Sequence, residues 1–123
     1  MTKRTRYDLR GKWTPWGPTQ DATEFAPGIV FHSTAGHGGF HLDRDAMRRF
    51  RKAIPDFHTF AGGSWFEEDC DACAVVLVFP EVFDSVAVEN CENQVRNWTA
   101  SDYFAPVARW LKAKEARHAA TYR

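Results

Sequence analysis

The residue best suited to chemistry in this sequence is His37, which lies between Gly36 and the pair Gly38-Gly39. Glycine lets a backbone approach a ligand closely and adopt positive φ, and successive amide N–H groups in such a loop can point at an anion. Imidazole can act as a general acid or base near neutral pH. Two interpretations fit: a ligand-binding or catalytic loop, and a hairpin turn that needs glycine and merely exposes His37.

Two more histidines, His32 and His41, alternate with Phe31 and Phe40 and could project from neighbouring strands beside the same loop. A group of three histidines could hold a metal ion or provide an acid or base. The spacing, however, matches no standard zinc pattern. We therefore predict neither a metal site nor a cofactor.

A second cluster of chemically active residues is acidic: Glu67, Glu68, Asp69 and Asp71 surround Cys70. Acids in the first turn of a helix are stabilised by the helix dipole, by roughly 0.3 to 1 kcal/mol each, and this explains much of the cluster without a function. Like charges three residues apart on a helix repel, however. A cation, an arginine or a ligand could relieve that repulsion, and a carboxylate beside a histidine could form an acid/base pair.

The cysteines do not indicate redox chemistry. Cys70 and Cys73 have the CxxC spacing of redox and metal sites, but Cys73 faces an apolar run, which favours buried structural thiols. An odd number of cysteines, three, without a secretion signal indicates reduced thiols and a cytoplasmic location. The sequence contains no nucleophile elbow, phosphate-binding lysine loop, dinucleotide fingerprint or HExxH motif.

Short strands and a helix should position the histidine loop. Residues 29–34 are rich in β-branched and aromatic side chains, and residues 40–42 can return beside them, with 35–39 as the connection. Asp43 is a suitable N-cap for a helix over residues 44–54, whose basic side chains, Arg48 among them, point outward.

The acidic cluster is predicted to open a helix, because Ser64-Trp65-Phe66-Glu67 matches the capping-box pattern. The apolar run over residues 72–79 fits a helix or a buried strand, and we favour the helix. Further helices are expected from Asp84 or Ser85 to about Arg96, and from Thr99 or Ser101 through the apolar stripe that ends near Leu111. These elements predict an α+β fold, a short antiparallel sheet packed against three or four helices.

The length of 123 residues fits a single domain. We predict a flexible basic arm over residues 1–12, an α+β domain over 13–118 and a frayed tail over 119–123. Sixteen Lys and Arg residues balance sixteen Asp and Glu residues, and no apolar run is long enough to cross a bilayer. A net charge of zero argues against both a protein that coats DNA and an acidic DNA mimic.

Several blocks of the chain together resemble a bacterial domain family of unknown function, over about residues 13 to 100. They are WTPWGPTQ (13–20), APGIVF (26–31), STAGHGG (33–39), WFEEDCD (65–71) and FPE (79–81). The family pattern has serine at Gly36 and tryptophan at Ala72, so this chain lacks a hydroxyl and an aromatic ring. The resemblance implies a small protein carried by plasmids, prophages and other mobile elements. Small proteins of such elements often counter host defence. Its polar residues carry over at His37, Glu67, Glu68, Asp69 and Asp71.

From the residues and the resemblance together we predict a binding module, an anti-CRISPR or other anti-defence inhibitor. Its expected partner is a bacterial complex that processes nucleic acids, without direct binding to nucleic acid or membrane. The predicted binding residues are Gly36, His37, Gly38, Gly39, His41, Arg48, Glu68, Asp69 and Asp71. The alternative is a small hydrolase or transferase with His37 as base and Glu67 or Glu68 as acid or metal ligand.

Overall fold

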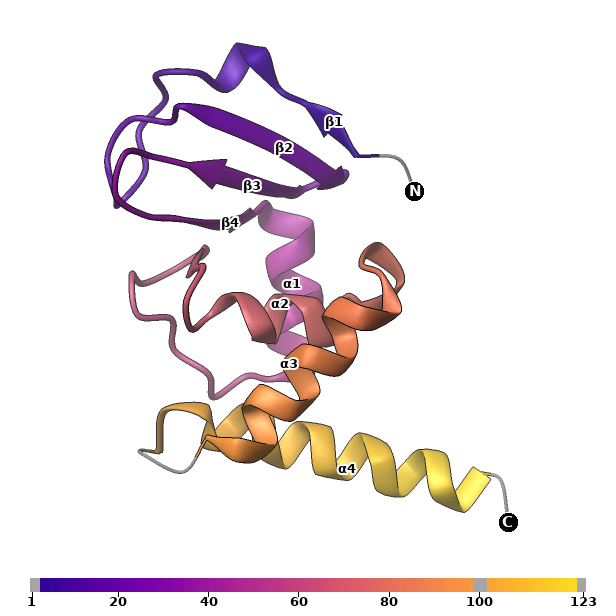
Figure 1. Ribbon diagram of the computed structural model, residues 1–123. Helices are drawn as coiled ribbons and strands as arrows, with labels where there is room; N and C mark the ends of the chain where they lie inside the picture. Colours follow the sequence, from indigo (N-terminus) through magenta and orange to yellow (C-terminus); the bar gives the residue numbers. More distant parts are fainter. Residues whose placement is uncertain (1–2, 99–101, 122–123) are drawn as a thin grey trace.

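The computed structural model describes residues 3–98 and 102–121 of the chain, and within them five strands form one antiparallel sheet (Figure 1). The strands follow one another in the sheet in the order of the sequence, so each pairs with the next. They are β1 (Arg4–Thr5), β2 (Asp21–Ala26), β3 (Ile29–Ser33), β4 (Gly38–Leu42) and β5 (Trp65–Glu67). The predicted strands and their connection are therefore confirmed, with the return strand beginning at Gly38.

The register of the sheet decides which side chains meet the helices. Phe40 lies opposite Phe31 on β3 and opposite Phe66 on β5. Directly paired residues share a face of an antiparallel sheet, so these rings lie on the face that belongs to the hydrophobic core. His41, which pairs with Val30 and Trp65, lies on the opposite face, called the outer face below.

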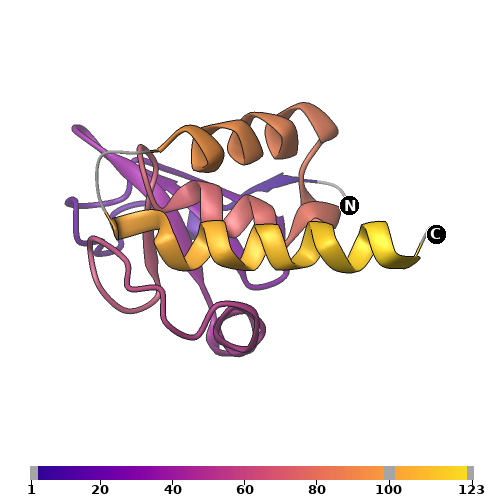
Figure 2. The ribbon, with the colours of Figure 1, turned by 90° about the horizontal axis from the view of Figure 1, so that it is seen from below.

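Within the described residues there are also four α-helices, which pack on one side of the sheet (Figures 1 and 2). They are α1 (Arg44–Ala53), α2 (Ala72–Val78), α3 (Ser85–Asn97) and α4 (Ala105–Thr121), accompanied by the short 3-10 helices η1 (Tyr7–Leu9), η2 (Pro80–Val82) and η3 (Asp102–Phe104). Together with the sheet they give the predicted α+β class. No helix in this part of the chain combines the length and hydrophobicity needed to span a bilayer.

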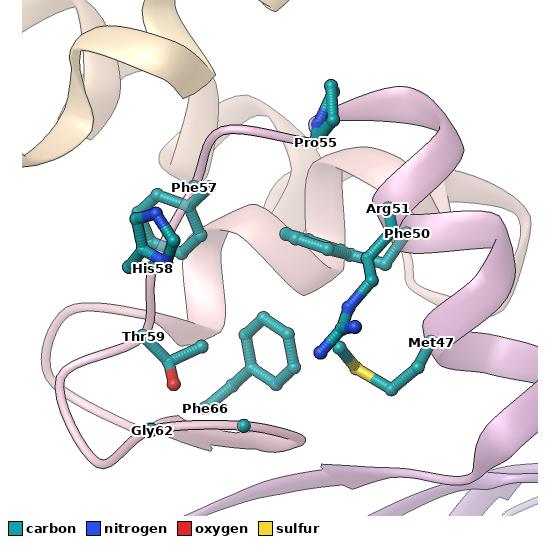
Figure 3. Close-up of a pocket in the computed structure, with 10 residues that line it drawn as sticks. Met47, Phe50, Arg51, Pro55, Phe57, His58, Thr59, Gly62 and Phe66 are labelled. Atoms are coloured by element: carbon teal, nitrogen blue, oxygen red, sulfur yellow. The ribbon is translucent and has the colours of Figure 1, made fainter.

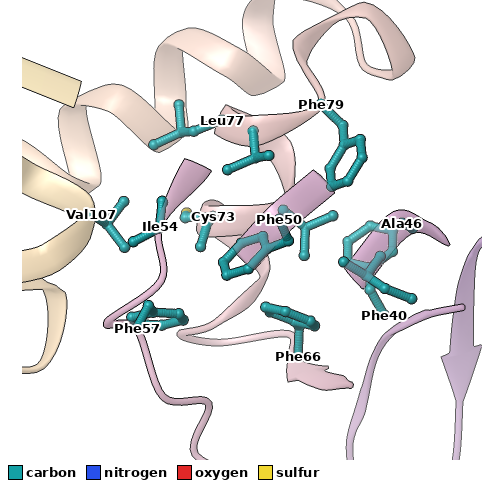
Figure 4. Packing of buried hydrophobic residues seen from close by; sticks show 14 of the residues in the cluster. Phe40, Ala46, Phe50, Ile54, Phe57, Phe66, Cys73, Leu77, Phe79 and Val107 are labelled. Carbon is teal, nitrogen blue, oxygen red and sulfur yellow. The ribbon is translucent and has the colours of Figure 1, made fainter. Parts of the chain in front are cut away.

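The central element of the fold is α2. Every residue from Cys73 to Val78 is buried, and the helix contacts β4 and β5 on one side and α1 and α3 on others. A helix that is apolar all round is stable only when other elements cover it on all sides. Figure 4 shows its neighbours Phe50, Ile54 and Val107 closing around it. The expected helix over 72–79 is thus confirmed.

Two of the predicted helix starts are confirmed by the hydrogen bonds at their caps. The Asp43 side chain accepts a hydrogen bond from the Ala46 amide at 2.9 Å, and the Asp84 side chain accepts one from the Ala87 amide at 2.8 Å. Each bond satisfies a backbone donor that the first turn leaves unpaired. The starts proposed for the last helix, Thr99 and Ser101, lie outside the described residues.

The prediction of a helix opening at Ser64 is wrong. Trp65–Glu67 form β5, and α2 begins only at Ala72. Pairing with β4 gives Phe66 a fully buried place in the core, and the Glu67 carboxylate accepts hydrogen bonds from residues that follow it instead of completing a capping box. A local capping pattern is a weaker determinant than a strand pairing that buries a phenylalanine ring.

The two chain ends, predicted as a flexible arm and a frayed tail, contain regular secondary structure where they are described. Within the basic arm of residues 1–12, Arg4–Thr5 pair with β2 as strand β1. Arg4 and Arg6 both form ion pairs with Glu24 of β2, which anchors the arm to the sheet. Of the tail over 119–123, residues 119–121 continue α4.

The segment between η1 and β2 covers the outer face of the sheet and buries His32. The Thr19 hydroxyl donates to the carbonyl of Lys12, and its oxygen lies 3.0 Å from Nδ1 of His32. The hydroxyl proton is therefore already used, and a neutral His32 donates its Nδ1 proton to Thr19. Burial, then the nearby charges of His41 and Arg6, lowers the pKa of His32 to about 4.

This lowered pKa predicts a loss of stability in mild acid. The unfolded chain takes up a proton at His32 below about pH 6.5, whereas the folded chain does so only near pH 4, so stability falls as the pH drops between these values. Replacing His32→Asn keeps a donor near Thr19 but removes the titration. Urea unfolding at pH 7 and pH 5 should show the wild type losing about 2 kcal/mol more than the variant.

The exposed His58 offers a matched control for this measurement, because His58→Asn removes a histidine that is not buried. The His58 variant should follow the wild type at both pH values. Equal losses for the wild type and the His32 variant would contradict the burial of a neutral imidazole under Thr19.

Candidate functional site

The acidic turn that follows β5 is organised around the carboxylate of Glu67. Its Oε2 accepts hydrogen bonds from the Asp69 amide at 3.1 Å and from the Cys70 thiol at 2.9 Å. The residue is only 8% exposed, whereas Glu68 and Asp69 are exposed. The turn therefore presents a buried, oriented carboxylate with two solvent-accessible carboxylates beside it.

The histidine loop is a tight turn closed by Thr34. The Thr34 hydroxyl donates to the carbonyl of His37 at 2.6 Å, and the His37 amide donates to the same hydroxyl oxygen at 3.2 Å. At the next residue, the carbonyl of Gly38 accepts a hydrogen bond from the Glu68 amide at 2.9 Å. This backbone bond joins the start of β4 to the acidic turn.

The two segments that the sequence singled out separately meet in space. Nδ1 of His37 lies 3.9 Å from Oε1 of Glu67. One potential ligand atom from each of His37, Glu67, Glu68 and Asp69 lies within 4.8 Å of the others. Below, these four residues are called the His–acid cluster. Their arrangement is compatible with a metal centre or with an acid/base pair.

Glycine is required where the two segments pack together. A Cβ atom on Gly38 would lie 2.8 Å from the carbonyl oxygen of His32 and 3.2 Å from a carboxylate oxygen of Glu68. A Cβ on Gly39 would collide with the Phe66 carbonyl and the Trp16 ring. The glycines thus allow close packing, while Gly36 faces open space and has no such requirement.

A pocket of about 280 Å³ lies next to the His–acid cluster, lined by Trp16, His37, Phe60, Glu67 and Cys70. Phe60 is 81% exposed. Beside the pocket, Trp13 and Trp16 both pack edge-on against Trp65, and Trp13 is 72% exposed. Trp13, Trp16 and Phe60 form what is called the aromatic rim below. Such rings supply apolar contact area for a ligand or a partner.

Asp71 links two segments of the site through hydrogen bonds. It is fully buried, and its Oδ2 accepts hydrogen bonds from the amides of Phe60 at 3.0 Å and Glu67 at 3.1 Å. Burial raises the pKa of Asp71 to about 6, against the opposing effect of the two amide bonds. The residue that the sequence predicted as a binding group thus lies inside the fold, where it connects the Phe60 loop to β5.

Two other predicted binding residues, His41 and Arg48, are not among the residues of the His–acid cluster. The ring of His41 packs against Trp65 at a centroid distance of 4.5 Å on the outer face. Arg48 is exposed on α1 and forms an ion pair with Asp45 at 3.2 Å. His32, the third histidine, is buried under Thr19. The possible metal ligands among the described residues thus include His37 but neither His32 nor His41.

The CxxC cysteines are free thiols with different surroundings. Burial, then the hydrogen bond to Glu67, raises the pKa of Cys70 to about 12. Cys73 is buried and contacts Cys91, and the hydrogen bond between their thiols raises the pKa of Cys73 as well. A thiol with a raised pKa is a poor nucleophile at neutral pH.

Sequence reasoning did not identify the aromatic rim as part of a site. Trp13 and Trp16 belong to a block of the family resemblance but to no predicted site, and Phe60 belongs to no motif. One usable signal was present, namely two tryptophans in a segment rich in proline and glycine. The pairing that places Trp16 over Gly39 could not be read from the sequence, because it depends on contacts across the outer face.

A comparison with protein families finds a match to a domain of unknown function, DUF7007, over residues 10–123. The chain belongs to this family. The resemblance to an uncharacterised family is thereby confirmed at that level, while the sequence blocks and the mobile-element setting stay predictions. No curated protein and no solved structure matches the chain.

The packing of the two segments predicts that alanine at Gly39 destabilises the DUF7007 domain and that alanine at Gly36 does not. Gly39→Ala forces a methyl group against the Phe66 carbonyl and the Trp16 ring and should lower the free energy of unfolding by about 1 to 3 kcal/mol. Gly36→Ala meets nothing within 4 Å and should change it by less than about 0.5 kcal/mol. Urea titration monitored by tryptophan fluorescence measures both, and equal effects would contradict the described packing.

Proposed function

We propose that this DUF7007 domain binds a divalent cation at the His–acid cluster and is a small hydrolase or transferase. The observation that supports the proposal is the convergence of His37 with Glu67, Glu68 and Asp69, whose potential ligand atoms lie within 4.8 Å of one another. The sequence favoured a binding module over this alternative because the resembled family is typical of mobile elements and because no catalytic motif was evident. The geometry favours the alternative, since groups from two distant segments meet beside a pocket.

The charges in the cluster explain why a cation would bind. Three carboxylates lie close together, and none of them forms an ion pair with a lysine or arginine among the described residues. Carboxylate oxygens are the ligands preferred by Mg²⁺, Mn²⁺ and Ca²⁺. The orientation of Glu67 by the Asp69 amide and the Cys70 thiol preorganises one ligand before the ion arrives.

In the proposed reaction the carboxylates bind the cation and the histidine transfers the proton. The carboxylates of Glu67, Glu68 and Asp69 would hold the cation, and Nδ1 of His37 would keep its proton toward Glu67 at 3.9 Å, which leaves the unprotonated Nε2 to accept a proton. His37 would take a proton from water or from a substrate hydroxyl, and the cation would stabilise negative charge on the attacked group. The pocket lined by Trp16 and Phe60 gives the apolar part of a substrate a place beside these groups.

Calorimetry with Mn²⁺ tests the cation site without knowledge of the substrate. The wild type should bind one Mn²⁺ ion, and Glu68→Gln, at an exposed position that tolerates substitution, should weaken binding at least about tenfold. Glu89→Gln, on the exposed surface of α3, should leave binding unchanged. Absence of saturable binding, or equal affinities for both variants, would overturn the cation site.

A second candidate, the binding module, is supported by the exposure of Trp13 and Phe60, because large exposed aromatics beside charged groups are typical of protein interfaces. In this account the aromatic rim and the carboxylates contact a basic surface of a host defence complex. The protein would then block that complex as an anti-CRISPR or other anti-defence inhibitor.

Plasmid transformation into bacteria with active restriction or CRISPR systems separates the two candidates. If the protein is an inhibitor, the double variant Trp13→Ser with Phe60→Ser should no longer protect the plasmid. The double variant His37→Ala with Glu68→Ala should then lose protection only to the extent that it loses binding to the partner. If it is an enzyme, His37→Ala with Glu68→Ala should abolish protection while the bound partner is still recovered. Protection that neither pair of substitutions changes would contradict both uses of this surface.

A further inference from the structure

A second hollow, separate from the His–acid cluster, lies where α1 ends and residues 55–63 lead to β5 (Figure 3). Its volume is about 270 Å³. Phe66 forms part of its wall, whereas the neighbouring Glu67 belongs to the cluster. Successive strand residues point to opposite faces of a sheet, so β5 separates the two cavities.

The base of this hollow is aromatic and already rigid. Phe50, Phe57 and Phe66 are all at least nine-tenths buried. The rings of Phe50 and Phe66 pack at a centroid distance of 4.9 Å, and those of Phe50 and Phe57 at 6.1 Å. Met47, which adds an adaptable thioether, completes the apolar wall. This lining suits the ring of a small aromatic ligand.

The polar groups of the hollow lack partners within the described part of the chain. Arg48 and Arg49 on α1 form ion pairs with Asp45 and Glu81, but no carboxylate of the described residues pairs with Arg51. Figure 3 shows the Arg51 side chain extending over the apolar base. Its guanidinium is thus available to an anion.

On the facing wall, the hydroxyl of Thr59 is buried and has no hydrogen-bond partner among the described residues. A buried hydroxyl without a partner costs free energy, and native structures contain few of them. A cationic fork, an unpaired hydroxyl and an aromatic base together resemble a ligand pocket in which few polar groups fix the orientation.

We propose that this hollow binds a small aromatic carboxylate. Arg51 donates to the carboxylate, for which a planar guanidinium provides matching paired donors. The ring lies against Met47 and Phe57, above the buried Phe50 and Phe66, and a rotation of the Thr59 side chain brings its unpartnered hydroxyl to a ligand oxygen. A volume of about 270 Å³ is near the lower end for ligand pockets, which suits a ligand no larger than a phenylacetate ion.

Amide and Arg Nε–H shifts in ¹H–¹⁵N NMR spectra of the full chain, titrated with phenylacetate, test the proposal. Saturable shifts are expected at Arg51, Thr59, Gly62 and Gly63, with a dissociation constant on the order of 1 mM. Acetate lacks the ring and 2-phenylethanol lacks the charge, so each should bind at least about tenfold more weakly. Equal shifts from acetate, or shifts spread over all exposed arginines, would overturn the proposal.

Variants locate the binding groups. Arg51→Met keeps the apolar stem and should weaken phenylacetate binding about 10- to 100-fold, because it removes a charge-assisted hydrogen bond. Thr59→Val replaces the buried hydroxyl with a similar shape and should weaken binding about threefold to tenfold. Arg48→Met, on the same helix outside the hollow, should bind as the wild type does.

Two results would reject the assignment outright. Unchanged affinity in both the Arg51 and the Thr59 variants would show that the ligand does not bind in this hollow. Tighter binding of phenyl phosphate than of phenylacetate would show that the anion recognised is a phosphate and not a carboxylate.

Discussion

The described architecture depends on one buried carboxylate. Oδ2 of Asp71 accepts hydrogen bonds from the amides of Glu67 and Phe60, which lie on different segments. These bonds hold β5 and the loop that carries Phe60 against Asp71, which directly precedes α2, the helix at the centre of the core. The two bonds replace part of the hydration that the carboxylate loses, while its Oδ1 has no partner among the described residues, in keeping with the raised pKa. The edge of the sheet, the loop and the central helix are thereby fixed as one unit.

The three residues of β5 contribute to two different cavities. Phe66 points into the core, where it contacts Phe50, and forms part of the wall of the hollow near α1. Glu67 points away from the core into the turn that meets His37. The alternation of a strand thus separates an apolar cavity from an acidic one without any insertion in the chain. The domain can place two chemically distinct sites within a short distance because a strand, and not a helix, connects them.

Much of the fold could be predicted from local signals. Asp43 and Asp84 identified helix starts because an N-cap requires only a few neighbouring residues, and the histidine loop was evident from its glycines. The candidate site was predicted in its two halves, and their meeting was a hypothesis. Strand β5 was missed because Ser64 to Glu67 carries a local helix pattern that a pairing with β4 overrides. The aromatic rim was missed for a related reason: its position depends on long-range contacts that no short motif encodes.

The proposed cation site joins the histidine loop and the acidic turn in a single centre. Paramagnetic broadening of ¹H–¹⁵N NMR signals by substoichiometric Mn²⁺ tests it most directly, because the broadening decays steeply with distance from the ion. The amides of His37 and Gly38 should lose intensity together with those of Glu68 and Asp69, while those around Glu81 and Glu89 should keep theirs. Broadening of the acidic turn without the histidine loop, or of all acidic surfaces alike, would contradict it.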